Sequence, residues 1–143
     1  MTLFVLDTDI LTLLQHGHPE VCHNVARHDA DDLAVSVISV EEQLSGWYTV
    51  IRKSKSNHLL AQAYEHLTLC VESLSDLRVL TFDEASIERF ANLRASRIPT
   101  RNPDLKIAAT VMECDGTLVT RNIRDFVQVP GLRVVDWSIA AKA

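Results

Sequence analysis

Five short apolar runs recur along the chain, and segments with the spacing of amphipathic helices separate them. Short, largely apolar runs are typical of parallel strands buried on both faces, and helices supply the crossovers that parallel strands need. The runs cover residues 2–6, 33–37, 78–82, 118–120 and 132–136. We therefore predict an α/β fold, a three-layer α/β/α sandwich with a central parallel sheet.

The helical segments are bounded by capping and breaking residues. Ser39 is predicted to cap one helix, with Glu42 three residues later completing a capping box, and Asn102 is predicted to cap another with Pro103 at its first position. The helix that follows Ser39 ends in a basic run at residues 52–56, and a further helix is expected over residues 57–74. These two helices predict a helical hairpin beside the sandwich.

Length, composition and charge narrow the class of protein. The 143 residues, 47% of them hydrophobic, fit one globular domain over residues 1–143. No run approaches the roughly 18 apolar residues of a membrane span, and no signal peptide precedes the first strand, so no membrane partner is expected. Cys22, Cys70 and Cys114 form no C-x-x-C pair, which favours a reducing cytoplasm. With a net charge of −5, the protein could hold a nucleic acid only through a local basic patch or metal ions.

Four acidic residues fall where a parallel α/β sheet binds its ligands. Asp7 and Asp125 follow strands, whereas Glu42 and Asp104 lie near helix starts. Because the ligand crevice lies beyond the carboxyl ends of the strands, all four are expected to face it.

Each acid also has an ordinary structural interpretation. Asp7 could only cap a helix, the capping box would explain Glu42, the helix dipole favours Asp104, and Asp125 could be a loop residue. Four residues that only cap helices or lie in loops would have no reason to converge on one point, however. Packing several carboxylates together without a cation would also raise their pKa values. A cluster of carboxylates without His or Cys suits Mg²⁺ or Mn²⁺.

Other sites find less support. There is no G-x-G-x-x-G, P-loop or G-x-S-x-G motif, and the six His residues lie in the first half of the chain, away from the acids. Arg121 and Arg124 flank the acids and are placed to meet phosphates, whereas the cations of residues 52–55 fit a solvated helix end.

Four motifs then occur in order along nearly the whole chain. They are Leu-Asp-Thr-Asp-Ile-Leu at 6–11, Ser-Val-Glu-Glu-Gln-Leu-Ser-Gly at 39–46, Asp-Leu-Lys-Ile-Ala-Ala-Thr at 104–110 and Leu-Val-Thr-Arg-Asn-Ile-Arg-Asp-Phe at 118–126, followed by Val-Pro-Gly-Leu at 129–132. With these motifs the chain resembles PIN-domain proteins of the VapC toxin type, the ribonuclease half of type II toxin–antitoxin pairs.

The resemblance implies a set of site residues. The family's first and third acids fall on Asp7 and Asp104. Its Glu-Leu-x-x-Gly places the second acid on Glu42, four residues before Gly46, although Gln43 replaces the usual Leu and a swap with Glu41 stays open.

The family's fourth acid falls at the position of Asn122, of Asp125 or of both. We expect Asp125 to be the ligand, with Asn122 as hydrogen-bonding support. Thr8 and Thr120 are expected to orient the carboxylates.

The resemblance also implies an activity and partners. It implies hydrolysis of RNA (tRNA, rRNA or mRNA) that depends on Mg²⁺ or Mn²⁺, in which a metal-activated water leaves a 5′-phosphate and a 3′-hydroxyl. It further implies a homodimer and a cognate antitoxin whose C-terminal segment lies across the acidic groove, giving a heterotetramer or a larger assembly.

Other functions remain to be weighed against this one. A catalytically inactive PIN-fold domain that binds nucleic acid or acts as a scaffold is the main alternative, and metal-dependent cleavage would separate the two. A Mg²⁺-dependent phosphatase of the haloacid dehalogenase class would share Asp7-x-Asp9, but Ile10-Leu11 replaces its Gly-Thr. A receiver domain would need a phosphoacceptor Asp at the end of its third strand and a Lys at the end of its fifth, and this sequence shows neither.

Overall fold

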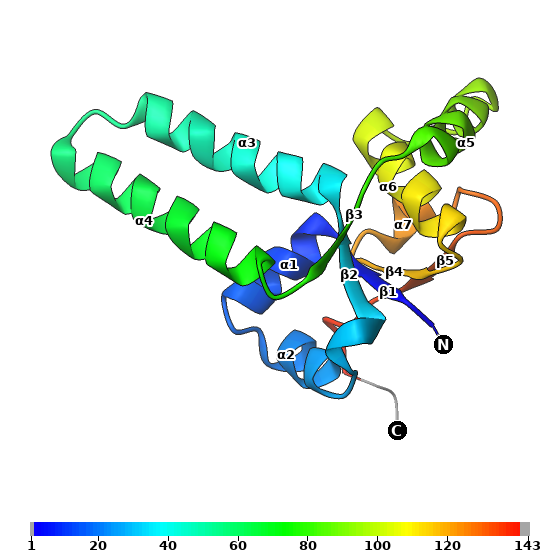
Figure 1. The fold of residues 1–143 in the computed structure, drawn as a ribbon, viewed down its shortest axis with the longest axis horizontal. Coiled ribbons are helices and arrows are strands. Elements are labelled where there is room, and N and C mark those ends of the chain that lie inside the picture. Colours follow the sequence, from blue (N-terminus) through cyan, green and yellow to red (C-terminus); the bar gives the residue numbers. More distant parts are fainter. Residues whose placement is uncertain (1, 141–143) are drawn as a thin grey trace.

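The computed structural model describes residues 2–140 and contains a five-stranded parallel sheet (Figure 1). The strands lie in the order β3-β2-β1-β4-β5, so β1 is central. Their bounds are β1 (Phe4–Leu6), β2 (Leu33–Ser36), β3 (Arg78–Leu80), β4 (Thr117–Val119) and β5 (Arg133–Val135). Each strand lies within a predicted apolar run or overlaps it, and every adjacent pair is parallel. The predicted fold class is confirmed.

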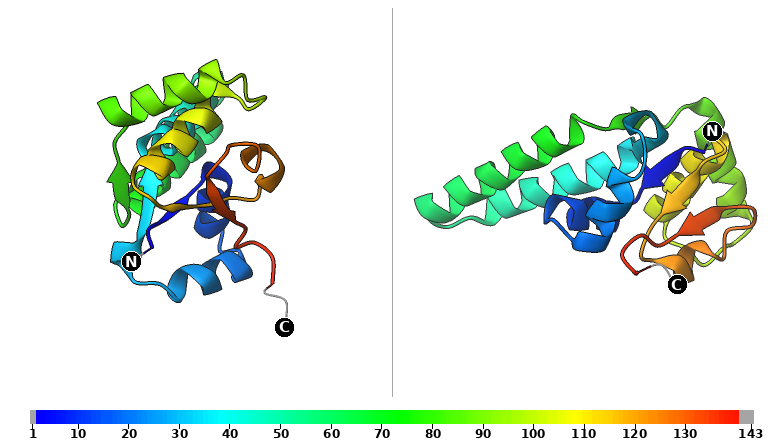
Figure 2. Two further views of the ribbon diagram at one scale, coloured as in Figure 1. Left: turned by 90° about the vertical axis from the view of Figure 1, so that its right-hand side faces the viewer. Right: turned by 90° about the horizontal axis from the view of Figure 1, so that it is seen from below.

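Helices cover both faces of the sheet (Figures 1 and 2). Their bounds are α1 (Thr8–Gln15), α2 (Pro19–Ala26), the 3₁₀ turn η1 (Ala30–Asp32), α3 (Val37–Lys53), α4 (Asn57–Leu74), α5 (Glu84–Ala95), α6 (Asn102–Glu113) and α7 (Ile123–Phe126). In residues 2–140 no helix is both long and apolar enough to cross a membrane.

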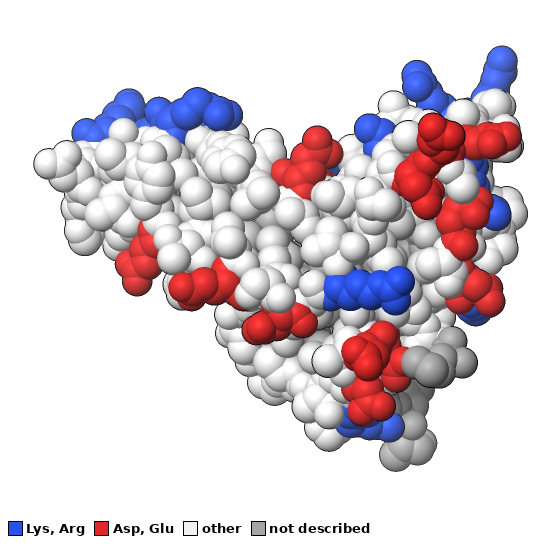
Figure 3. Space-filling model, in the orientation of Figure 1, with Lys and Arg blue, Asp and Glu red and all other residues white. Residues whose placement is uncertain are grey.

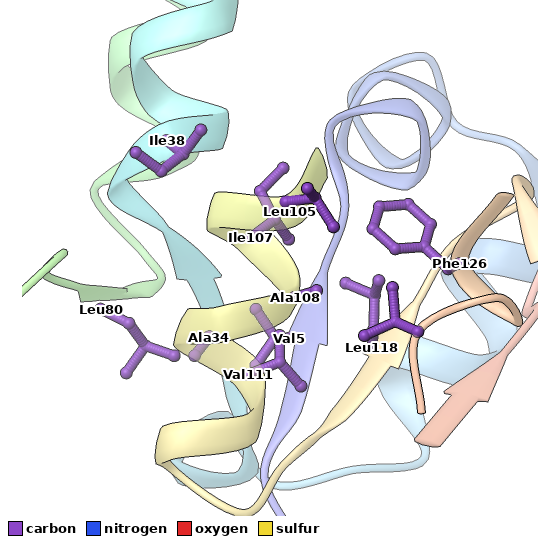
Figure 4. Close-up of a cluster of buried hydrophobic side chains, with 11 residues drawn as sticks. Val5, Ala34, Ile38, Leu80, Leu105, Ile107, Ala108, Val111, Leu118 and Phe126 are labelled. Carbon is purple, nitrogen blue, oxygen red and sulfur yellow. The ribbon is translucent and has the colours of Figure 1, made fainter. Parts of the chain in front are cut away.

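Alternating side chains of the strands build two cores, one on each face. Val5, Ala34 and Leu118 point to the face covered by α6 and α7, where Phe126 is fully buried (Figure 4). Leu6 and its neighbours point to the other face, against α1, α2 and the sheet ends of α3 and α4. This period of two explains why the inner strands are largely apolar, because both of their faces are covered, whereas the edge strand β3 keeps Arg78 and Val79 exposed.

The hairpin of α3 and α4 projects away from the sheet (Figures 1 and 2). Only its sheet end joins the second core, through residues such as Cys70 and Leu74. The hairpin is therefore an arm attached at one end, as the sequence predicts.

Two predicted caps are wrong. Strand β2 passes into α3 without a loop, so the last strand residue, Ser36, becomes the cap, and its Oγ accepts from the backbone N of Ile38 at 3.1 Å. Ser39 lies inside the helix instead, buried with an Oγ that has no partner within the described residues. At α6 the extended residue before the helix is Arg101, and Asn102 is already helical, so it caps nothing.

Candidate functional site

Asp7 stands between the central strand and the first helix, at the carboxyl edge of the sheet. Its backbone N donates to the carbonyl of Val119 at 2.9 Å, which ties the end of β1 to the end of β4. Its Oδ1 accepts from the backbone N of Thr8 at 2.8 Å, and its Oδ2 accepts from Thr120 Oγ1 at 2.7 Å. Asp7 does cap α1, but its second oxygen is held by another strand, so its side chain is also part of a tertiary network.

Glu42 reaches the same place from α3. Thr8 Oγ1 donates to Glu42 Oε1 at 3.1 Å, across 34 positions in the sequence. The capping-box interpretation of Glu42 is wrong, because the helix begins earlier and this carboxylate faces α1. Glu41 is exposed and makes no hydrogen bond to the other predicted site residues within residues 2–140.

The end of β4 supplies the next members. Thr120 Oγ1 accepts from the backbone N of Asn122 at 3.0 Å, and Asn122 Nδ2 donates to Asp125 Oδ2 at 3.0 Å. Asp125 lies in the short helix α7, where a polar loop was expected. Hydrogen bonds thus link six predicted residues in one series: Glu42, Thr8, Asp7, Thr120, Asn122 and Asp125.

Asp104 enters from the start of α6 and is 5% exposed. It lies close enough to Asp7 for its negative charge to raise the pKa of that carboxyl group. The guanidinium of Arg101 lies against it, with Nε 3.5 Å from Oδ2 and Nη2 3.5 Å from Oδ1. Arg101 was not predicted, and its spacing of three residues from Asp104 was the available signal.

Burial dominates the electrostatics of the site. It raises the pKa of Asp7 from 3.8 to about 7, and the negative charges of Asp9 and Asp104 add to the rise, while hydrogen bonds from Thr120 and Thr8 oppose it. Burial therefore makes the charged form of Asp7 unfavourable in the protein alone.

Asp9 is a second residue that sequence reasoning missed, although the Asp-x-Asp spacing pointed to it. Its Oδ2 accepts from the backbone N of Arg121 at 3.2 Å, and its Oδ1 is buried with no partner in the described part of the chain. Burial raises the pKa of this carboxyl group too. Asp9 thus adds a further carboxylate beside Asp7.

The donor set suits a hard divalent cation. The buried and half-buried groups are carboxylate, hydroxyl and amide oxygens, without His or Cys, which is the chemistry that Mg²⁺ and Mn²⁺ prefer. Within residues 2–140, no three acidic, His or Cys side chains are close enough to ligate one ion together. An ion held here would therefore take at most two of these side chains directly and would keep several of its waters, as Mg²⁺ does in proteins.

The two predicted RNA-binding arginines lie beside this cluster. Arg121 and Arg124 are both exposed, on either side of Asn122, and neither forms an ion pair among the residues described. Their charges are free to meet a polyanion.

Curated relatives resemble this chain over almost its full length. Ribonuclease VapC2 of Rickettsia felis is 27% identical, with 94% of this chain and 98% of the relative covered. Ribonuclease VapC1 of Haemophilus influenzae is 24% identical, with 95% and 98% covered. No protein-family model matches the sequence.

Solved structures share the fold. The DNA-bound VapBC complex of Salmonella typhimurium contains a chain that matches with a TM-score of 0.79 and 26% identity, covering 96% of this chain and 99% of that one. The VapBC2 complex of Rickettsia felis, bound to a DNA fragment from its promoter, matches with a TM-score of 0.74 and 27% identity, covering 95% and 99%.

Proposed function

We propose that this chain, a PIN-domain protein of the VapC type, is an endoribonuclease that depends on Mg²⁺ or Mn²⁺ and is neutralised by a cognate antitoxin. The observation that carries the proposal is the hydrogen-bonded series from Glu42 through Asp7 to Asp125, with Asp104 beside it. Residues from four separate parts of the sequence meet at the carboxyl edge of the sheet, where α/β proteins bind ligands. Likeness to proteins named as ribonucleases supports RNA as the substrate.

Asp7 and Asp104 are the residues proposed to hold the metal ion, with Glu42 and Asp125 reaching it through bound water. A bound divalent cation supplies an activated water nucleophile and neutralises charge on the phosphoryl group. The high pKa of Asp7 supports this assignment, because a carboxylate so poorly compensated gains most from a neighbouring cation.

The neighbouring hydroxyl groups orient these carboxylates. Thr120 Oγ1 donates to Asp7 Oδ2 while accepting from Asn122, so its proton direction is fixed by its two partners. Thr8 Oγ1 donates to Glu42 Oε1 and so orients that carboxylate. A carboxylate held in one orientation presents its free lone pairs in a constant direction, which is the role of such supporting residues in metal sites.

The structure favours one member of each ambiguous pair. Glu42 bonds to Thr8 whereas Glu41 is exposed, which supports Glu42 as the functional acid. Asn122 donates its amide to Asp125, which supports Asp125 as the charged member and Asn122 as the residue that orients it.

Exposed arginines supply the contacts to substrate. Arg121 and Arg124 are proposed to meet phosphates that flank the scissile bond. Arginine is suited to this role because its planar guanidinium can make two parallel hydrogen bonds to one phosphate.

The partners are proposed on the same basis. Several structural neighbours are VapBC complexes, and one is described as a member of the VapBC family of toxin–antitoxin systems, which supports an antitoxin as the partner of this chain. The hairpin exposes large apolar side chains, including Leu59, Tyr64 and Leu69, and these offer surface for the antitoxin and for a homodimer, giving a heterotetramer or larger complex.

A cleavage assay tests the function. A panel of labelled tRNA, rRNA and mRNA fragments is incubated with purified protein in Mg²⁺, Mn²⁺ or chelator. We expect metal-dependent cutting that leaves 5′-phosphate ends and is lost in Glu42→Gln but kept in Glu41→Gln, the matched control. Tight RNA binding without cutting in any metal would instead identify an inactive PIN-fold binding domain.

A further inference from the structure

The charged residues of α3 are separated along its length. Its two acids, Glu41 and Glu42, lie near its start beside the site, and its two cations, Arg52 and Lys53, lie in its last turn. Residues 43–51 between them carry no charge, and Lys55 follows just beyond the helix. Figure 3 shows Lys and Arg side chains gathered over the outer end of the hairpin, on one side of a broad hollow in the molecular surface.

These cations have no acidic partners. In the part of the chain that the structure describes, Arg52, Lys53 and Lys55 form no salt bridge, and Arg52 only donates to Thr49 Oγ1 at 3.3 Å. The helix dipole favours cations in the last turn, but it gives no reason for a third cation beyond the helix. In a protein of net charge −5, this is a local concentration of unpaired positive charge.

An exposed aromatic ring lies on the face that joins the acids to the cations. Glu41, Ser45, Tyr48 and Arg52 follow one another at helical spacings of four, three and four residues, and all four are exposed. Tyr48 is 45% exposed, whereas its neighbour Trp47 stacks on His66 of α4. Small residues precede the ring, and a Cβ on Gly46 would meet nothing within 4 Å. This face is therefore open from Glu41, the neighbour of the site residue Glu42, to Arg52.

We propose that this outer face of α3 is an RNA-binding surface that guides the strand leaving the cleavage site. One base stacks on Tyr48, and backbone phosphates lie against Arg52, Lys53 and Lys55. Aromatic rings combined with basic residues are the usual elements of single-strand binding. The inference rests on the proposed ribonuclease function and adds the path of the substrate beyond the scissile bond.

The geometry makes the effect depend on RNA length. Lys53 lies eleven residues beyond Glu42 on the helix, so the cations are about 16 Å from the site along the axis at 1.5 Å per residue. An RNA that only fills the site cannot reach them, whereas a longer strand can. Short and long substrates should therefore respond differently to changes on this face.

The test compares two fluorescent single-stranded RNAs with the same cut sequence, of about 4 and about 20 nucleotides, in cleavage and in binding without metal. The variants are Tyr48→Ala and Arg52→Gln/Lys53→Gln. Exposed Ile87→Ala on α5 and Arg27→Gln at the end of α2 are the controls, since neither residue belongs to the site or to the hairpin.

We expect Tyr48→Ala to weaken binding of the long RNA about 5- to 150-fold, raising KM without changing kcat. The double variant should lower the slope of log K against log salt by about 1.4, near 0.7 for each phosphate that is no longer neutralised. The short RNA and both controls should be unaffected. If the variants and the controls bind and cut the long RNA equally well, the inference is wrong, and the proposed ribonuclease function is unaffected. Binding without cutting would contradict the proposed ribonuclease function. The binding measurements alone would then test whether α3 binds RNA.

Discussion

At Asp7, hydrogen bonding and burial act on the pKa in opposite directions. The backbone N of Thr8 and the hydroxyl of Thr120 favour the charged form, whereas burial and the charges of Asp9 and Asp104 favour the neutral form. Burial is the larger influence, so the pKa rises to about 7. Without a cation, Asp7 is therefore only partly ionised near neutral pH, and its ionisation opposes folding.

This imbalance predicts how the stability of the metal-free protein depends on pH. The contribution of Asp7 is fully present below its unfolded pKa of 3.8 and is lost as pH rises through about 7. Asp7→Asn removes the charge but keeps the shape. We expect it to raise the free energy of unfolding at pH 8 by on the order of 3 kcal/mol, with little change at pH 4.

Urea denaturation in chelator at both pH values measures the difference. Asp29→Asn, in an exposed loop, is the control. If wild type and Asp7→Asn lose stability in parallel between pH 4 and pH 8, ionisation of Asp7 does not oppose folding.

Some residues of the site could be predicted from the sequence, and others could not. Asp7, Glu42 and Asp104 carry recognisable motifs, so their places could be predicted. The role of Asp9 depends on the backbone of Arg121, which is far away in the sequence, so the local sequence gives little sign of it. Arg101 lies only three residues from Asp104, and this spacing could have identified it.

At the scale of elements, two serines test where helix α3 begins. Ser36 caps the helix by accepting from Ile38, whereas the buried Oγ of Ser39 has no partner within residues 2–140. We expect Ser36→Ala to lower the free energy of unfolding by about 1 kcal/mol. Ser39→Ala should be neutral or stabilising, because it removes an unsatisfied buried hydroxyl.

Thermal and urea denaturation of the two variants provide the measurement. The reverse order, with Ser39→Ala the more damaging, would restore the cap that the sequence suggested and place the start of α3 later. That result would also reopen the capping-box role of Glu42.

Strands were easier to predict than helix starts. An apolar run buried on both faces is visible in sequence, whereas a cap depends on which residue stays extended. At α6 that residue is Arg101, which supplies no side-chain cap, although Asn102 is the better capping residue type. Propensity was therefore overridden by the path of the chain into the helix.

At the scale of the whole molecule, a partly buried polar network joins the hairpin to α1. Gln43 Oε1 accepts from Gln15 Nε2 of α1 at 3.2 Å and from Cys70 Sγ of α4 at 3.4 Å. Gln15 also donates to Ser73 Oγ at 2.8 Å. One side chain thus joins three helices, at the position where the family usually has Leu.

Removing Gln43 should loosen this attachment. We expect Gln43→Ala to lower the free energy of unfolding by about 1–3 kcal/mol, because it leaves buried partners unsatisfied. Hydrogen exchange should quicken in the sheet end of α4. Gln62→Ala, exposed further out on α4, is the control and should stay within about 0.5 kcal/mol of wild type. Equal effects of the two changes would show that the network does not anchor the hairpin.

The central claim is that acids from separate elements form one metal-dependent site for RNA hydrolysis. It is tested most directly by the single-turnover rate of cleavage of one labelled RNA at increasing Mg²⁺, for wild type, Asp7→Asn, Asp104→Asn and the exposed control Asp29→Asn. We predict a rate that saturates with Mg²⁺ in wild type and control, and a drop of about 100-fold or more in both site variants. Cleavage that persists in chelator, or that survives both site substitutions, would contradict this claim.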